Sequence, residues 1–229
     1  MIRLLHIDSS ARPGRSDDRA HGSHTRRLSA RFVRKWRAQR QQDVIVDRDL
    51  ALQPPTPVTG QWVHAAFTAP AQRERWMQDV LAESDALVDE LIAADLIVIG
   101  VPMYNFGMPS TLKAWIDNIV RVGRTFGFDR SRVGEPYWPL LAGEEKRVVL
   151  LSSRGDYGYD HRLRSSNHVE AGVMTPLRYI GIDSFERVAI EYDEFADARL
   201  QTSIAAAESE VDALVARLAA ELEPQRACA

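Results

Sequence analysis

The sequence of 229 residues contains a single cysteine, Cys228, next to its C-terminus. One cysteine excludes an intramolecular disulfide, a cysteine-rich zinc site and a Cys-X-X-Cys redox centre. Apolar runs of the roughly 20 residues that span a bilayer are also missing. The first residues lead directly into a strand-like run, without the apolar core of a signal peptide. We therefore expect a cytoplasmic protein.

A surplus of basic charge is missing as well. The formal net charge is −3, so the sequence has no excess of Lys and Arg for binding nucleic acid. Neither a Gly-X-Gly-X-X-Gly fingerprint nor a Walker sequence occurs, which argues against a Rossmann dehydrogenase and against a glycine-based phosphate site. The six histidines show no ligand spacing, and we expect no bound metal.

What the sequence does contain is a regular alternation of strand-like and helix-like segments. The expected strands are Ile2–Ile7, Val44–Val46, Leu96–Val101, Val148–Leu151 and Phe185–Ile190. The expected helices cover about 25–40, a long region around 76–91, 110–122, 170–180 and 197–222. Strict alternation implies a parallel sheet with helices on both faces. We expect a single flavodoxin-like α/β domain over residues 1–229, a three-layer sandwich whose five-stranded parallel sheet has the order 2-1-3-4-5.

An unusual loop follows the third expected strand. Pro102 ends that strand because it has no N–H to donate and disfavours helix at Val101. Residues 103–106, Met-Tyr-Asn-Phe, then stand at the carboxyl end of a buried strand, where open α/β sheets bind their ligands. Two aromatic rings, a thioether and an amide suit a flat heteroaromatic ligand with polar edges. The alternative is that these side chains only plug the top of the sheet.

Hydroxyl groups stand on both sides of the loop after the first strand. Ser9 and Ser10 end the strand, and Ser23-His24-Thr25 precede the first helix. Hydroxyls, free backbone N–H groups and the helix dipole together form an anion site at a helix N-terminus. The two clusters favour phosphate as the ligand, with loop arginines such as Arg12 adding positive charge. Simple capping of the helix by Ser23 or Thr25 is the alternative.

The loop after the fourth strand faces the same cleft in this topology. It reads Ser153-Arg154-Gly155-Asp156. Gly155 permits close approach of the backbone to a ligand, and Ser153 offers hydrogen bonds to a polar ring edge. A plain turn explains these four residues equally well when they are taken alone.

Together the three loops resemble those of the FMN-dependent NADH-azoreductase and NADH:quinone oxidoreductase family, which are flavoenzymes with the flavodoxin-like fold. The resemblance covers most of the chain, and its most specific piece is the segment 101–106, Val-Pro-Met-Tyr-Asn-Phe. It implies that this segment wraps the isoalloxazine ring of FMN and that hydroxyls of the first loop bind the phosphate. The cofactor-binding residues implied in this way are Ser10, Ser23, His24, Thr25, Pro102, Met103, Tyr104, Asn105, Phe106, Ser153, Arg154, Gly155 and Asp156.

The sequence departs from the family pattern at two places. Residues Arg12 to Gly22 lengthen the first loop, so the phosphate contacts come either from Ser23 to Thr25 or from Ser16 to Asp18. The family has a second glycine where this chain has Asp156, which places a carboxylate near the pyrimidine side of the ring.

The resemblance implies an enzyme that takes a hydride from NADH or NADPH and passes two electrons to a quinone or an azo compound. FMN carries the chemistry, so we expect no side chain to act as nucleophile or metal ligand. No second nucleotide fingerprint is visible, and donor and acceptor are expected to alternate in ping-pong kinetics. The alternative is a non-enzymatic electron carrier of flavodoxin type, which is usually shorter and strongly acidic.

Aromatic residues crowd the long connection 123–146, where the sequence has Phe126, Phe128, Tyr137 and Trp138. An aromatic-rich surface loop favours an interface. The resemblance implies a homodimer in which the partner subunit completes each flavin site. The alternative is that the connection packs onto its own subunit.

Overall fold

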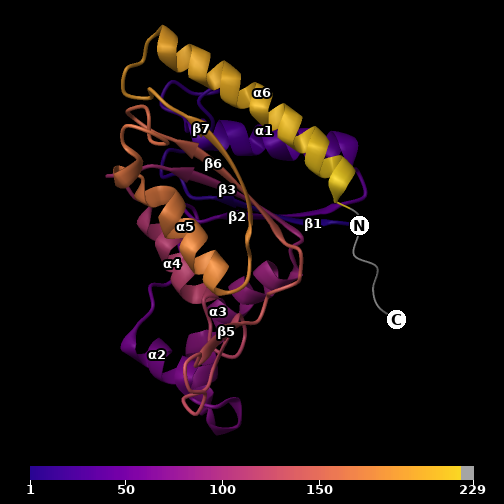
Figure 1. Cartoon of the computed structure of the whole chain (residues 1–229), viewed down its shortest axis with the longest axis vertical. Helices are drawn as coiled ribbons and strands as arrows, with labels where there is room; N and C mark the ends of the chain where they lie inside the picture. Colours follow the sequence, from indigo (N-terminus) through magenta and orange to yellow (C-terminus); the bar gives the residue numbers. More distant parts are fainter. Residues whose placement is uncertain (223–229) are drawn as a thin grey trace.

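The computed structural model describes residues 1–222, so Cys228 lies outside the described part. Its centre is a parallel sheet of five strands in the order β2-β1-β3-β6-β7 (Figure 1). The strands are β1 (Arg3–Asp8), β2 (Val44–Asp49), β3 (Leu96–Pro102), β6 (Arg147–Ser153) and β7 (Ser184–Ile190). The order follows the expected pattern 2-1-3-4-5. The strand numbers differ because two short strands outside this sheet lie between β3 and β6 in the chain.

The position of each strand in the sheet explains its sequence. All residues of β3 are buried, because β1 and β6 flank it and helices cover both of its faces. β2 is an edge strand that runs past the predicted end at Val46, since Asp49 still pairs in register with Asp8. The prediction stopped too early because the second half of β2 carries the charged residues of a partly exposed edge.

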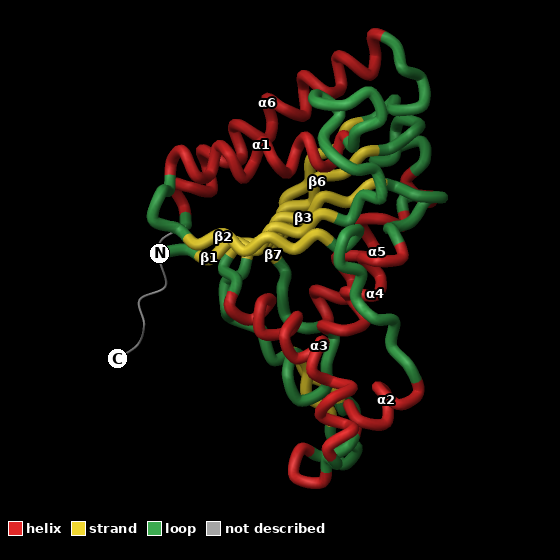
Figure 2. The backbone as a smooth tube through the Cα atoms, turned by 180° about the vertical axis from the view of Figure 1, so that it is seen from behind, coloured by secondary structure: helices red, strands yellow, loops and turns green. Residues whose placement is uncertain are grey.

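One face of the sheet is covered by α1 (His24–Gln39) and α6 (Ala198–Glu221), which lie side by side (Figures 1 and 2). Their apolar residues form one core with the sheet, built by Leu28, Phe32, Trp36, Leu214, Val215 and Leu218. At the surface, Arg31 of α1 pairs with Asp212 of α6 at 2.7 Å. Both helices match the amphipathic patterns that predicted them.

The other face is covered by α3 (Arg75–Ala93), α4 (Ser110–Ile119) and α5 (His168–Tyr179). A second core lies between these helices and the sheet, and it includes Leu87, Leu91, Trp115, Ile116, Val173 and Leu177. None of the helices in residues 1–222 is both long enough and apolar enough to cross a membrane.

A lobe made of α2 (Gly60–Phe67) and a small hairpin extends away from the sheet (Figure 2). The predicted long helical region around 76–91 is α3. α2 and the 3-10 turn Pro70–Gln72 precede it and were not predicted, and Pro70 separates them because it cannot continue a helix from the residues before it. The hairpin pairs β4 (Phe126–Phe128) with β5 (Tyr137–Pro139) within the connection 123–146, where the sequence predicted no strands.

Candidate functional site

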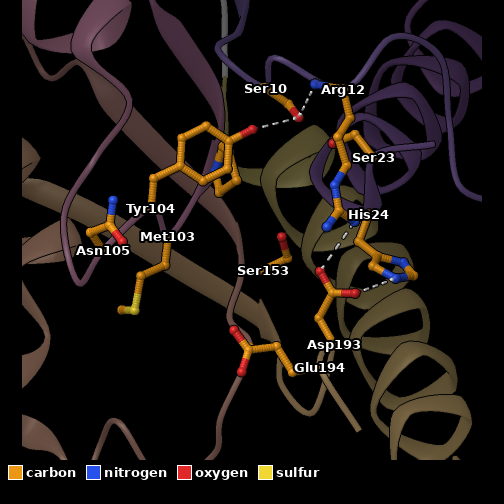
Figure 3. Close-up of a pocket in the computed structure, with 12 residues that line it drawn as sticks. Ser10, Arg12, Ser23, His24, Met103, Tyr104, Asn105, Ser153, Asp193 and Glu194 are labelled. Atoms are coloured by element: carbon orange, nitrogen blue, oxygen red, sulfur yellow. Dashed lines mark hydrogen bonds and ion pairs between the residues drawn. The ribbon is translucent and has the colours of Figure 1, made fainter. Parts of the chain in front are cut away.

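A cavity of about 440 Å³ opens at the carboxyl ends of β1, β3 and β6 (Figure 3). This volume lies within the range of about 300–1,000 Å³ for ligand sites, and the place is the switch point between β1 and β3. The lining residues are Ser10, Arg12, Ser23, His24, Pro102, Met103, Tyr104, Asn105, Ser153, Gly155, Asp193 and Glu194. The structure therefore brings residues of all three predicted loops to one cavity.

The N-terminus of α1 forms one end of the cavity. Ser23 caps the helix, and its Oγ accepts a hydrogen bond from the backbone N–H of Arg26 at 3.2 Å. Within residues 1–222, the backbone N–H groups of His24 and Thr25 have no hydrogen-bond partner. Unpaired N–H groups at a helix N-terminus attract an anion. Ser23 thus caps the helix and lines the cavity as well.

The inserted segment of the first loop folds into a compact unit that ends at Ser23. The N–H of Ser23 donates to the carbonyl of Gly14 at 2.9 Å, and the N–H of Ser16 donates to the carbonyl of Ser23 at 3.1 Å. Ser16 supports the cavity indirectly, because its hydroxyl lies 2.8 Å from Nδ1 of His24. Ser23 and His24 line the cavity, whereas Ser16 to Asp18 do not.

The side chain of Arg26 stabilises the first loop through hydrogen bonds to its backbone. Its Nη2 donates to the carbonyl of Ser10 at 2.9 Å, and its Nε donates to the carbonyl of Arg12 at 3.1 Å. The same guanidinium is bidentate to Asp49 at the end of β2. Burial favours the neutral carboxyl of Asp49, but the bonds to Arg26 outweigh it and lower the pKa of Asp49. Sequence reasoning missed Arg26, since no local pattern marks an arginine that braces a distant loop.

The loop after β3 forms the opposite end of the cavity with Met103, Tyr104 and Asn105. The N–H groups of Tyr104 and Gly107 donate to each other's carbonyls at 2.8 and 3.0 Å. The central residues have positive φ, 47° at Asn105 and 68° at Phe106, which identifies a type I′ turn. The Phe106 side chain is 52% exposed and lies outside the cavity lining.

The loop after β6 contributes only part of its predicted residues. Ser153 and Gly155 line the cavity. Arg154 is 2% exposed and points away from the cavity to pair with Glu170 and Glu191. Asp156 pairs with Arg162 at 2.9 Å, and a hydrogen bond from this arginine lowers the pKa of its carboxyl.

Of the predicted residues, Thr25, Phe106, Arg154 and Asp156 do not line the cavity. Thr25 is fully buried, and its hydroxyl lies 2.9 Å from that of Ser23. The resemblance implied Arg154 as a site residue through the match of residues 153–156, but Glu170 of α5 and Glu191, just after β7, pair with its side chain and turn it inward.

Two carboxylates of the cavity were not predicted. Asp193 and Glu194 follow β7, whose carboxyl end lies at the same edge of the sheet as those of β1 and β3. Asp193 lies 3.3 Å from Nε2 of His24 and 3.6 Å from Nη1 of Arg12 (Figure 3). The hydrogen bond with His24 lowers the pKa of Asp193. The acidic segment 191–194, Glu-Tyr-Asp-Glu, which follows β7, was the available signal.

The cavity therefore has two chemically different ends. Hydroxyls, free N–H groups, the Arg12 guanidinium and the His24 ring stand at the α1 end, whereas a thioether, an aromatic ring and an amide stand at the β3 end. A ligand with an anionic group at one end and a flat aromatic system at the other matches this division.

Comparison with known proteins gives consistent matches over nearly the whole chain. The sequence profile of the family described as "Flavodoxin-like fold" matches residues 2–215. The chain is 40% identical to an "FMN-dependent NADH:quinone oxidoreductase 2" of Colwellia psychrerythraea, over 95% of this chain and 100% of that protein. It is 40% identical to an "FMN-dependent NAD(P)H:quinone oxidoreductase 1" of Pseudomonas aeruginosa, over 93% of this chain and 98% of that protein.

Solved structures share the fold. An azoreductase of Bacillus anthracis superposes with a TM-score of 0.82 at 20% identity, covering 95% of this chain and 100% of that chain. A second structure from the same species, an FMN-dependent NADH-azoreductase solved in complex with FMN, gives a TM-score of 0.81 at 19% identity, over 96% of this chain and 100% of that chain.

Proposed function

We propose that this chain, which belongs to the family of FMN-dependent NADH:quinone oxidoreductases with the flavodoxin-like fold, holds FMN in the cavity between the β1, β3 and β6 loops. It is an FMN-dependent oxidoreductase that takes electrons from NADH or NADPH and reduces quinones and azo compounds. The observation that carries the site assignment is the division of one cavity into an anion-binding end and an aromatic end.

The residues present fit FMN. The hydroxyls of Ser10 and Ser23 and the unpaired N–H groups of His24 and Thr25 would hold the phosphate. Met103 and Tyr104 would pack against the ring system, and the Asn105 amide would donate or accept hydrogen bonds at its polar edge. These assignments match the sequence prediction for the residues that line the cavity.

When bound, FMN supplies the two-electron transfer from a nicotinamide to an acceptor. The protein contributes position and environment. The rigid turn 104–107 fixes the wall at the β3 end, and Arg26 fixes the backbone at the phosphate end. Donor and acceptor would use the same open side of the cavity in turn, which supports ping-pong kinetics. We expect quinones to be reduced faster than azo dyes, since cleavage of an azo bond needs two rounds of two-electron transfer.

We also propose a homodimer in which the β4–β5 hairpin contributes to the interface. Tyr137 is 49% exposed and stacks on Phe128, with ring centroids 4.7 Å apart. Phe126 instead is buried against Tyr179 at 5.2 Å, so part of the connection packs onto its own subunit. Sedimentation of the wild type as a dimer, and of Tyr137→Ser as a weaker one, is the expected result. A monomeric wild type would contradict the proposal.

We further propose that residues 1–229 form a single domain and that the protein acts in the cytoplasm. Two cores packed on opposite faces of one sheet support the single domain. Dependence on NADH or NADPH, which are donors of the cytoplasm, supports the location.

Two measurements test the function. Titration of the purified protein with FMN should quench flavin fluorescence at one FMN per chain. NADH oxidation with a benzoquinone should then proceed with many turnovers. Binding of FMN without turnover would favour the flavodoxin-type electron carrier, and failure to bind FMN would reject both functions.

A further inference from the structure

Asp193 lies against Arg12 and His24, two side chains of the cavity's anion-binding end. Its carboxylate is 3.6 Å from Nη1 of Arg12 and 3.3 Å from Nε2 of His24 (Figure 3). All three residues line the cavity. The carboxylate thus neutralises positive charge at the place where the proposed function puts the phosphate of FMN.

The two partners of Asp193 are held differently. The His24 side chain is mostly buried, and its Nδ1 lies 2.8 Å from the Ser16 hydroxyl. With Nε2 protonated, the ring accepts from Ser16 and donates to Asp193. The Arg12 side chain is 53% exposed, and its guanidinium has no other partner within residues 1–222. Arg12 can therefore leave Asp193 without breaking another contact.

The backbone of Asp193, in contrast, is held in place. Its backbone N–H donates to the carbonyl of Arg154 at 3.1 Å, and the next residue, Glu194, donates to the carbonyl of Gly155 at 3.2 Å. These bonds fix the start of the β7–α6 loop to the loop after β6. The carboxylate stays in the cavity wall while the long Arg12 side chain is free to turn toward a ligand.

We propose that Asp193 is an internal competitor of the FMN phosphate for Arg12 and His24. This inference rests on the proposed function. Binding of the phosphate would exchange one anion for another at both donors, so each phosphate contact would require breaking an existing contact with Asp193. Arg12 is then a phosphate-binding residue whose contribution Asp193 conceals.

The proposal predicts the direction in which two substitutions change the affinity for FMN. Asp193→Asn keeps the shape and removes the charge, so FMN should bind about three- to tenfold more tightly, as expected for loss of a competing ion pair together with its repulsion of phosphate. Riboflavin lacks the phosphate, and its dissociation constant should change less than about twofold. Arg12→Gln should weaken FMN binding more in the Asp193→Asn background than in the wild type.

Glu194→Gln is the matched control. Glu194 lines the same cavity, but no cationic side chain lies within ion-pair distance of its carboxylate in residues 1–222. Removal of its charge should leave the ratio of the FMN and riboflavin dissociation constants close to that of the wild type. Thermal unfolding of each variant checks that its fold is retained.

Fluorescence titrations with FMN and riboflavin, and displacement of FMN by inorganic phosphate, test the proposal. Tighter FMN and phosphate binding in Asp193→Asn alone supports it. Unchanged or weaker FMN binding in Asp193→Asn overturns it and leaves the flavoenzyme assignment intact. Equal tightening in Asp193→Asn and Glu194→Gln also overturns it, since general charge would then be the cause. A wild type that binds neither flavin would overturn the proposed function together with this inference.

Discussion

Gly22 lies against the backbone of Arg15, so closely that a Cβ atom at position 22 would stand 2.0 Å from the carbonyl oxygen of Arg15. Only glycine permits this contact, because the oxygen belongs to the backbone and cannot rotate away as a side chain would. The contact closes the inserted segment of the first loop onto Ser23, the residue that caps α1 and lines the cavity. The insertion is therefore a folded support of the anion-binding end.

Gly22→Ala should weaken FMN binding more than riboflavin binding, because the loop must open and displace Ser23 from the phosphate end. Loss of one hydrogen bond to a charged group costs about 1.5–3 kcal/mol, which corresponds to about 10- to 150-fold in affinity. Gly60→Ala is the control, since a Cβ at position 60 meets no atom within 4 Å. Flavin titration measures both variants, and equal losses for FMN and riboflavin would contradict the assignment.

Phe106 adopts a left-handed backbone conformation with φ 68°, which residues other than glycine rarely adopt. Phe106→Gly should relieve this strain, so it should be more stable toward urea than Phe106→Ala by about 1 kcal/mol. If the exposed ring takes part in binding FMN or its substrates, both variants should lose the same fraction of kcat/KM. Unequal losses would mean that the backbone, and not the ring, carries the effect.

The buried Arg154 holds two carboxylates, Glu170 and Glu191, behind the loop after β6. Arg154→Met should lower the free energy of unfolding by about 3–5 kcal/mol, because it removes the buried cation between two partly buried carboxylates, of which Glu191 loses its ion-pair partner and Glu170 keeps only Arg187. Arg187 also pairs with Glu170, but its side chain is half exposed, so Arg187→Met should cost less than about 1 kcal/mol. Urea unfolding followed by circular dichroism compares the two, and similar losses would show that burial does not decide the difference.

His6 gives the stability of the fold a dependence on pH. Burial by itself lowers the pKa of His6, but hydrogen bonds with Asp47 and Asp8 and their charges outweigh it and raise the pKa to about 9. The protonated form favours the folded state, so the stabilisation is complete below the unfolded pKa of about 6.5 and is lost as the pH rises through about 9.

The free energy of unfolding contributed by His6 should therefore fall by on the order of 2–3 kcal/mol between pH 6.5 and 9.5. His6→Gln should not show this fall. Titration of the His6 ring by nuclear magnetic resonance checks the pKa directly, and a midpoint near 6.5 would refute the prediction.

The sequence predicted the fold well where the local pattern of apolar and polar residues within one segment is enough to identify its structure. The run Leu96–Val101 is apolar throughout because β3 is covered on all sides, and the segment 103–106 follows it at the edge where ligands bind. The hairpin was missed because β4 and β5 have only three residues each and cannot show a period. Their pairing depends on the contact of Gly127 with Trp138, which no local pattern reveals.

Parts of the site could not be predicted because they depend on residues far apart in the chain. Arg154 was expected in the cavity, but Glu170 and Glu191 turn it inward. Asp193 reaches the cavity only because β7 pairs beside β6. Arg26 reaches the first loop only because Asp49 at the end of β2 fixes its guanidinium. Each of these roles follows from the arrangement of the sheet.

The packing of α6 on α1 has a consequence for synthesis. Leu28, Phe32 and Trp36 of α1 belong to a core that α1 and α6 share with the sheet, and α6 is the last helix of the described residues to be made. Nascent chains that still lack α6 would therefore leave part of this apolar core uncovered, although all five strands of the sheet have already been made. Truncated products that end before residue 198 would then bind chaperones and aggregate rather than mature.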